Sequence, residues 1–408
     1  MILAIHGSPL TRSFIRIAKM TNGSTFSGLN KNISENKTAR FIDVETSRRI
    51  TSLRYILSVL VVFIHNNFTA EKLAESLAEG NKIPIFAQSV AGEWIQFVIS
   101  SALGSCAVPL FFMFSAYLFF KKDTPYKVML KKKTRGLLIP YFVWIALNIA
   151  LVTLGKLFAA RLNPSLLANP EKISVLTWSF LDWLKAFSGF GFDKFNHPYV
   201  GQLWFVRDLL ILFLISPVLR VIYRRFPKTS LIFCAFIYIS GITPQGFDSD
   251  KAALLFFTLG YFWAERNFSP FAFADSFRGT ELLAMFAFSA LGCNLIFKGN
   301  SVCSALMVLF SALIFLKLSG SISKNQKTFI FAEKLSPFSF FLFAVHMPFI
   351  LVCVQNLWLH FLPMKNPAFC LLEYFGANIV IVTLGTFAGV VLRKICTPLF
   401  SALNGGRG

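Results

Sequence analysis

Charged side chains are scarce in this sequence of 408 residues. Lys, Arg, Asp and Glu make up 14% of the chain, hydrophobic residues make up 55%, and the mean hydropathy is +0.62. A soluble globular domain usually carries about 25% charged residues. Folded in water, a chain this apolar would expose large hydrophobic patches. The composition therefore excludes an ordinary soluble domain and indicates that lipid forms part of the solvent.

Acidic residues are scarcer still. Against 40 Lys and Arg stand only 19 Asp and Glu, which gives a net charge of +21. In a soluble protein this excess would suggest a nucleic-acid partner. In a membrane protein it follows from the positive-inside rule and from anionic lipid headgroups. We therefore expect membrane lipids, and no nucleic acid, among the partners.

Signatures of metal sites and soluble enzymes are also missing. The seven cysteines are scattered, without a C-x-x-C pair or a histidine cluster beside them, which argues against a zinc site or a disulfide framework. The chain has no G-x-S-x-G, no H-E-x-x-H and no phosphate-binding G-x-x-x-x-G-K. We expect no metal site and no soluble hydrolase fold.

Apolar runs fill most of the chain after residue 53. A transmembrane helix needs roughly 20 mostly apolar residues, and ten runs approach or exceed that length. They lie near 51–69, 95–120, 136–158, 203–223, 229–247, 251–266, 281–298, 301–319, 337–358 and 370–392. The sequence therefore predicts an all-α, polytopic integral membrane protein with about ten transmembrane helices.

Loop charges predict the orientation of these helices. The stretch KKDTPYKVMLKKKTR, between the second and third runs, has seven basic residues and one acidic residue, whereas the loop after the first run is rich in Glu. The positive-inside rule then places both termini in the cytoplasm. We expect a basic, disordered cytoplasmic tail over 1–47, the transmembrane domain over 48–393 and a short tail over 394–408.

One long loop, about 159–202, is predicted to face the other compartment. Its segment LTWSFLDWLKAF has apolar residues at helical spacing and two tryptophans, a pattern typical of an amphipathic helix in the membrane interface. The following GFGFDKFNHPYVGQ is either a surface loop or part of an acceptor site, and the sequence leaves both open.

The first run carries Arg54 and His65, eleven positions apart. At 100° per residue both lie on one helix face, roughly 16 Å apart along the axis. Arg54 is expected at the cytoplasmic boundary and His65 deep in the membrane. Both residues also have a purely structural explanation. Arg54 would anchor the helix by extending its charge to the membrane surface, and His65 would make a hydrogen bond that packs two helices together.

Further polar residues interrupt later runs. Arg207 and Asp208 are adjacent, point about 100° apart and need not pair; an ion pair to another helix would also explain them. His346 precedes Pro348, which loosens a helix locally. Glu373, near the end of the last run, is expected to be interfacial. Intramembrane charges mark functional sites by default.

Two classes of membrane protein would explain these residues. A proton-coupled transporter would use His65, Arg207, Asp208 and His346 as a relay, whereas a membrane enzyme would use a buried imidazole as general base. There is no obvious inverted repeat and no pair of broken helices, features that would favour a transporter.

Six blocks in sequence order then carry a family resemblance. They are LRYILSVLVVFIH, VPLFFMFSAYLFF, KKTRGLLIPYFVW, LWFVRDLLILFLISP, FTLGYFWAER and SFFLFAVHMPFI. Together, over about 48–393, they resemble the acyltransferase 3 family of membrane-bound bacterial enzymes that acylate sugars and cell-envelope glycans. The first block has the family's hallmark arginine, ten intervening residues and histidine.

Three positions depart from the family pattern. Thr51 stands where the family often has an acidic residue, Ala116 where glycine is common, and Lys132 with Arg135 where two arginines are common. A lysine keeps the charge but loses bidentate phosphate recognition, so the donor contacts are the part of the pattern most affected.

The resemblance implies roles for the polar residues. His65, with Arg54, would be catalytic, His65 acting as general base; an acyl-histidine intermediate stays open. Arg54, Lys132 and Arg135 would bind the phosphates of an acyl-CoA donor, a substrate rather than a tightly bound cofactor. Arg207, Asp208 or His346 would serve the acceptor or the oxyanion.

The same resemblance predicts an O-acetyltransferase of the bacterial cytoplasmic (inner) membrane. Acetyl-CoA would be the donor, and a hydroxyl of a cell-surface glycan or lipid-linked sugar the acceptor. Glycan-assembly proteins or a second copy of the chain are possible partners. The proton-coupled transporter and a catalytically inactive scaffold of glycan assembly stay open as alternatives.

Overall fold

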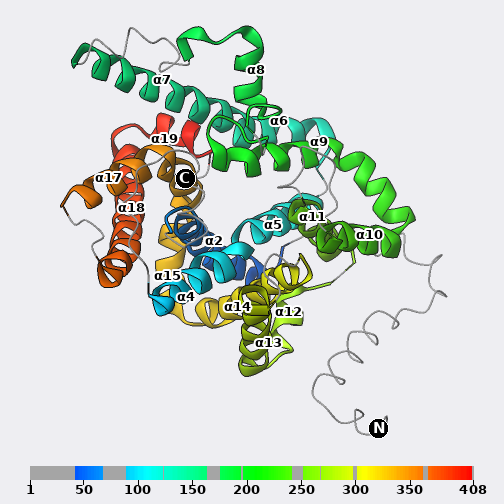
Figure 1. The fold of residues 1–408 in the computed structure, drawn as a ribbon. Coiled ribbons are helices and arrows are strands. Elements are labelled where there is room, and N and C mark those ends of the chain that lie inside the picture. Colours follow the sequence, from blue (N-terminus) through cyan, green and yellow to red (C-terminus); the bar gives the residue numbers. More distant parts are fainter. Residues whose placement is uncertain are drawn as a thin grey trace, which may run out of the picture. The chain divides into compact units, whose positions relative to one another are not determined.

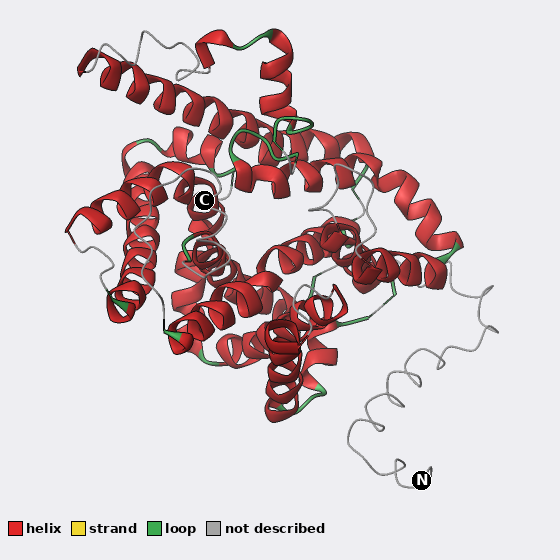
Figure 2. Ribbon diagram, viewed as in Figure 1, coloured by secondary structure: helices red, strands yellow, loops and turns green. Residues whose placement is uncertain are grey.

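The computed structural model describes residues 42–67, 89–122, 124–162, 175–193, 196–240, 251–266, 268–296, 301–361 and 366–406. Every regular element in these ranges is a helix, and none is a strand (Figures 1 and 2). The all-α prediction is therefore confirmed for this part of the chain. The helices from the first half are α2 (Val44–His65), α4 (Val90–Gln96), α5 (Ala107–Phe120), α6 (Tyr126–Lys133), α7 (Ile139–Leu162), α8 (Phe180–Ser188) and α9 (Trp204–Arg225). Those from the second half are α10 (Pro227–Ser240), α11 (Lys251–Glu265), α12 (Pro270–Asp275), α13 (Gly279–Leu291), α14 (Ser301–Lys324), α15 (Gln326–Leu335), α16 (Ser339–Val345), α17 (Leu351–Phe361), α18 (Pro367–Ile395) and α19 (Thr397–Leu403).

Within the described residues, each of the ten predicted runs falls on one helix or on consecutive helices. In the part of the chain that the structure describes, six stretches are long and apolar enough to cross a membrane: Val90–Phe120, Tyr126–Phe158, Gly279–Ile296, Ser301–Lys324, Gln326–Trp358 and Pro367–Ile395. Pro227–Ser240 and Ala252–Glu265 are apolar but shorter. The helices α2 and α9 have 22 residues each and carry arginines inside. The count of about ten spans and the cytoplasmic position of both termini stay predictions.

Helix α2 lies between α5 and α18 (Figure 1). It starts after Asp43, whose carboxylate accepts a hydrogen bond from the Thr46 amide at 2.7 Å, a favourable N-cap. The start at Val44 makes the last residues of the predicted 1–47 tail helical, while residues 1–41 lie outside the described part. Leu53, Leu57 and Val61 form a buried apolar stripe at four-residue spacing, so α2 is held by its neighbours along its length.

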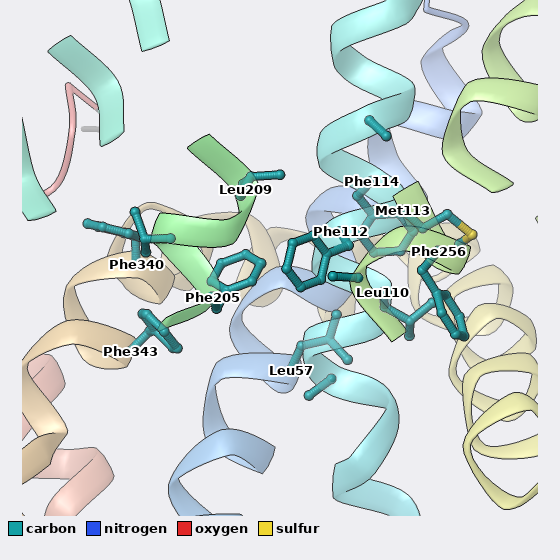
Figure 3. Packing of buried hydrophobic residues seen from close by; sticks show 14 of the residues in the cluster. Leu57, Leu110, Phe112, Met113, Phe114, Phe205, Leu209, Phe256, Phe340 and Phe343 are labelled. Carbon is teal, nitrogen blue, oxygen red and sulfur yellow. The ribbon is translucent and has the colours of Figure 1, made fainter. Parts of the chain in front are cut away.

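An aromatic core joins the helices around α2. Phe112 of α5 meets Phe205 of α9 at 4.8 Å between ring centroids, and Phe205 meets Phe343 of α16 at 5.7 Å. Figure 3 shows these rings beside Leu57 of α2. Edge-to-face aromatic pairs add stabilisation beyond their buried area. This packing fixes α2, α5, α9 and α16 relative to one another near the predicted site.

The start of α2 is anchored by a buried arginine. Arg49 donates two hydrogen bonds to the carboxylate of Asp275, at 2.6 and 2.9 Å, and further ones to Ser319 and to the Leu316 carbonyl. Because the guanidinium is bidentate and its donors are used, this pair fits a structural role. It ties α2 to α12 and α14.

The predicted amphipathic segment forms α8. Ser179 and Asp182 close a capping box at its start, and the hydrogen bonds from Ser179 lower the pKa of Asp182. Its apolar side chains Phe180 and Leu184 are exposed. This pattern fits a helix that lies in a membrane interface.

Candidate active site

Arg54 and His65 share one unbroken helix, as the sequence predicts. Their eleven-residue separation in α2 therefore corresponds to about 16 Å along the axis. His65 is the last residue of α2, and both side chains are half-buried. Within the described ranges no hydrogen bond or ion pair engages the Arg54 guanidinium. The helix thus presents a cation near its middle and an imidazole at its end.

The structure brings His346 to His65. The two ring centroids lie 5.4 Å apart, with the ring planes tilted by 37°. His346 is fully buried where α16 ends, and the next residue, Met347, leaves helical geometry at φ −121° and ψ 153°. The predicted loosening of the helix before Pro348 is therefore confirmed. Two histidines that are distant in the sequence form one site.

The break at His346 is supported by α9's entry segment. Gln202 donates hydrogen bonds from Nε2 to the carbonyl oxygens of Ala344, at 3.2 Å, and Met347, at 2.7 Å. An interrupted helix leaves carbonyls without helical partners, and such groups are costly when buried. Gln202 satisfies two of them on either side of His346 and so holds that segment in place.

A buried amide network surrounds the residue after His65. Asn66 accepts a hydrogen bond on Oδ1 from Gln355 Nε2, at 2.7 Å, and on its backbone oxygen from Asn378 Nδ2, at 3.0 Å. Asn66 and Asn378 are fully buried. These contacts connect the end of α2 to α17 and α18. The position of His65 therefore depends on three helices.

Glu373 is fully buried against this network, among the helices of the protein. Its expected depth near the membrane interface stays a prediction. Its carboxyl faces the Asn66 side chain, yet neither carboxyl oxygen has a hydrogen-bond partner among the described residues. The neighbouring Tyr374 is also buried and bonds to Ser100 at 2.8 Å. Hydropathy places Glu373 near the N-terminal end of its run, but it cannot show that other helices cover that end.

Buried polar atoms without partners gather around the end of α2. In the described ranges they include Asn66 Nδ2, Gln202 Oε1, His346 Nε2, both Glu373 carboxyl oxygens and Asn378 Oδ1. Proteins leave few buried polar groups unsatisfied, and each one calls for an explanation. The end of α2 is therefore a candidate functional site.

Arg207 and Asp208 pair with each other, at 2.7 Å between Arg207 Nε and Asp208 Oδ1, although their adjacent positions did not require it. The long arginine side chain folds back because its other donors reach the Ser188 and Asn196 carbonyls in the loop before α9. Gly189, at φ +83°, leaves room for this guanidinium. The pair therefore clamps the predicted extracytoplasmic loop to α9, and a role toward acceptor or oxyanion stays a prediction.

The end of this loop packs onto the same region. His197 lies 6.4 Å from the Trp204 ring in a stacked arrangement and 3.4 Å from the Asp193 carboxylate. Burial lowers the pKa of His197, and Asp193 opposes this shift. The tail of the loop is thus ordered against α9 where residues 190–193 and 196–202 are described, whether or not it also binds an acceptor.

A basic cavity of about 530 Å³ lies between α5, α6 and α9. Five cationic side chains line it: Lys122, Lys132, Lys133, Arg220 and Arg224. Glu265 pairs with Arg220 at 2.7 Å and with Arg224 at 3.6 Å. Of the three predicted donor-binding residues only Lys132 lines the cavity; Arg54 and Arg135 do not. A sequence search missed Arg220 and Arg224 because they belong to another helix, although RVIYRR marks the loop as basic.

Comparison with known proteins settles the family. Residues 48–394 match the family model for the acyltransferase 3 domain, described as an acyltransferase domain. The chain belongs to the acyltransferase 3 family. It is also 24% identical over 379 residues to the succinoglycan biosynthesis protein ExoH of Rhizobium meliloti (strain 1021), covering 90% of this chain and 94% of the relative. No solved structure matches. Membership of the acyltransferase 3 family, with six stretches among the described residues that are long and apolar enough to span a membrane, supports a multi-pass membrane acyltransferase and does not favour the transporter.

Proposed function

We propose that this protein transfers an acetyl group from acetyl-CoA to a hydroxyl of a cell-surface glycan or lipid-linked sugar, in the bacterial cytoplasmic membrane. Family membership supports acyl transfer, and a relative named for succinoglycan biosynthesis supports a glycan acceptor. The observation that carries the proposal is the histidine of the family's hallmark, His65, at a helix end beside a second buried imidazole. That placement suits proton transfer away from bulk water.

In this mechanism His65 is the general base. It takes the proton of the acceptor hydroxyl while the hydroxyl oxygen attacks the thioester carbonyl carbon. The bond between carbon and sulfur then breaks, and His65 returns the proton to the departing CoA sulfur. The products are the O-acetylated acceptor and CoA, so the step balances without a net proton. A preformed site favours this transfer because its groups need little rearrangement.

The donor binds through its phosphates. The cavity between α5, α6 and α9 gathers five cations, including Lys132, which complement the negative charges of CoA. Arg54, about 16 Å from His65 along α2, would contact the extended pantetheine arm between the phosphates and the thioester. Arg135 belongs to the same basic stretch as Lys132 and adds to the positive field there.

The experiment uses membranes that contain the endogenous acceptor. Inverted vesicles from cells that express the protein are incubated with acetyl-CoA labelled in the acetyl group, and label in alkali-labile glycan ester is counted. We expect incorporation with wild type and with His360→Ala, since His360 is an exposed histidine on α17, but a loss of about 100-fold or more with His65→Ala. Equal incorporation by all three would refute the general-base role. No incorporation by wild type, together with gradient-driven sugar uptake, would favour a transporter.

A further inference from the structure

Burial of the His346 imidazole costs folding free energy, and the mechanism above gives this residue no role. It is fully buried within the apolar stretch Gln326–Trp358, where polar side chains persist mainly for function. It also stands where the helix is broken, and Gln202 holds the carbonyls of Ala344 and Met347 on both sides of it. The imidazole is therefore fixed in position.

The hydrogen bonds of His346 determine its tautomer. Nδ1 lies 3.2 Å from the carbonyl oxygen of Leu342. A carbonyl oxygen only accepts, so Nδ1 carries the hydrogen, and in the neutral ring Nε2 carries the lone pair. Nε2 is buried, and no group of the described residues hydrogen-bonds to it. His346 thus offers an acceptor, not a donor, and in this tautomer it cannot stabilise an oxyanion.

The imidazole of His65 lies beside the His346 ring. The ring centroids are 5.4 Å apart and the ring planes are tilted by 37°, which allows an N–H···N hydrogen bond when a ring nitrogen of His65 turns toward Nε2 of His346. The hydrogen bond that one ring nitrogen of a histidine makes decides which nitrogen bears the proton. A partner at Nε2 of His346 would therefore set the state of His65.

We propose that His346 is a positioning residue for His65. Its Nε2 accepts a hydrogen bond from one ring nitrogen of His65, which orients the ring and leaves the lone pair on the other nitrogen, where the acceptor hydroxyl binds. This inference rests on the proposed function, because it assigns His346 a part in the same reaction. An orienting partner of this kind is what a histidine base requires to act in a single tautomer.

Two substitutions of similar size test the proposal. His346→Gln keeps a side-chain oxygen that accepts a hydrogen bond near the place of Nε2 but cannot take up a proton. His346→Leu removes the acceptor. In the vesicle assay with labelled acetyl-CoA, we expect His346→Leu to lower kcat about 100-fold with KM for acetyl-CoA unchanged. His346→Gln should recover at least tenfold over His346→Leu.

The controls separate this inference from a loss of structure and from the proposed function. Rates are normalised to the amount of monodisperse protein in detergent, so misfolded variants are not counted. A His346→Leu rate within threefold of wild type would refute positioning. If the Gln and Leu variants are equally inactive while both are folded, His346 takes a proton itself or serves only the fold, and positioning is again wrong. A wild type that transfers no acetyl group would instead refute the proposed function and the inference with it.

Discussion

At the scale of single residues, the end of α2 has several buried polar side chains that lack hydrogen-bond partners among the described residues. Glu373 carries a carboxyl whose two oxygens lack partners among the described residues, and it faces Asn66, the residue after His65. A buried polar group without a hydrogen-bond partner normally destabilises a protein by about 1–3 kcal/mol. Its presence is consistent with stability given up for activity.

The first prediction concerns Glu373→Gln. The amide has the same shape but cannot ionise or transfer a proton, so we expect the thermal midpoint in detergent to stay equal or rise, while acetyl transfer falls at least tenfold. Glu333→Gln, an exposed carboxylate on α15, should change neither quantity. Full activity of Glu373→Gln would show that the carboxyl serves no part of the reaction.

The second prediction concerns the donor cavity. Lys132→Ala removes one of its five cations, and a charged hydrogen bond is worth about 1.5–3 kcal/mol, so KM for acetyl-CoA should rise about tenfold or more. The rate with S-acetylpantetheine, which lacks the nucleotide phosphates, should not change. The exposed Lys327 on α15 provides the control as Lys327→Ala. An equal effect on both donors would mean that Lys132 does not recognise phosphate.

At the scale of helices, α5 and α11 pack with their backbones in close contact at Gly260. A Cβ on Gly260 of α11 would overlap the Met113 carbonyl oxygen and lie 2.7 Å from Ala116 Cβ. Small residues let membrane helices approach closely. Ala116, which stands where the family commonly has glycine, is therefore accommodated by a glycine on the facing helix.

The third prediction compares two glycines in helices. Gly260→Ala forces the backbones of α5 and α11 apart. We therefore expect a loss of about 1–3 kcal/mol in the free energy of unfolding, visible as a lower thermal midpoint in detergent. Gly155→Ala on α7, where nothing lies within 4 Å of the added Cβ, should leave the midpoint equal or slightly higher because alanine favours helix. Equal midpoints for the two variants would contradict the close approach of α5 and α11.

Helices were the most predictable part of the molecule, and the contacts between them the least. Apolar runs of sufficient length predict helices directly, and the spacing of Arg54 and His65 holds because α2 is unbroken. The meeting of His65 with His346, and the cover over Glu373, depend on which helices pack together. Hydropathy is nearly uniform around each apolar helix, so it does not specify those neighbours.

At the scale of the whole molecule, the groups assigned to the donor, to proton transfer and to the acceptor lie at different depths along the predicted membrane normal. The proposed donor cavity lies between α5, α6 and α9 and adjoins basic loops, whereas α2 runs from its basic start to His65, and the loop with α8 follows on the predicted opposite side. This arrangement would let a cytoplasmic donor meet an acceptor that never enters the cytoplasm. It requires the orientation that the loop charges predict.

The fourth prediction tests that orientation. In a variant without the seven native cysteines, Thr177→Cys before α8 and Lys327→Cys on α15, both at exposed positions, are treated with a membrane-impermeant maleimide. We expect Thr177→Cys to react in spheroplasts and Lys327→Cys to react only after the membrane is opened. Labelling of both from the same side would contradict the predicted topology.

The central claim is acyl transfer that depends on His65, and the O-acetyl content of cell-surface glycans measures it most directly. A strain that lacks this protein is complemented with wild type or with His65→Ala, expressed at equal levels. We predict that wild type restores the ester and that His65→Ala does not. Equal restoration by the two proteins would contradict the claim.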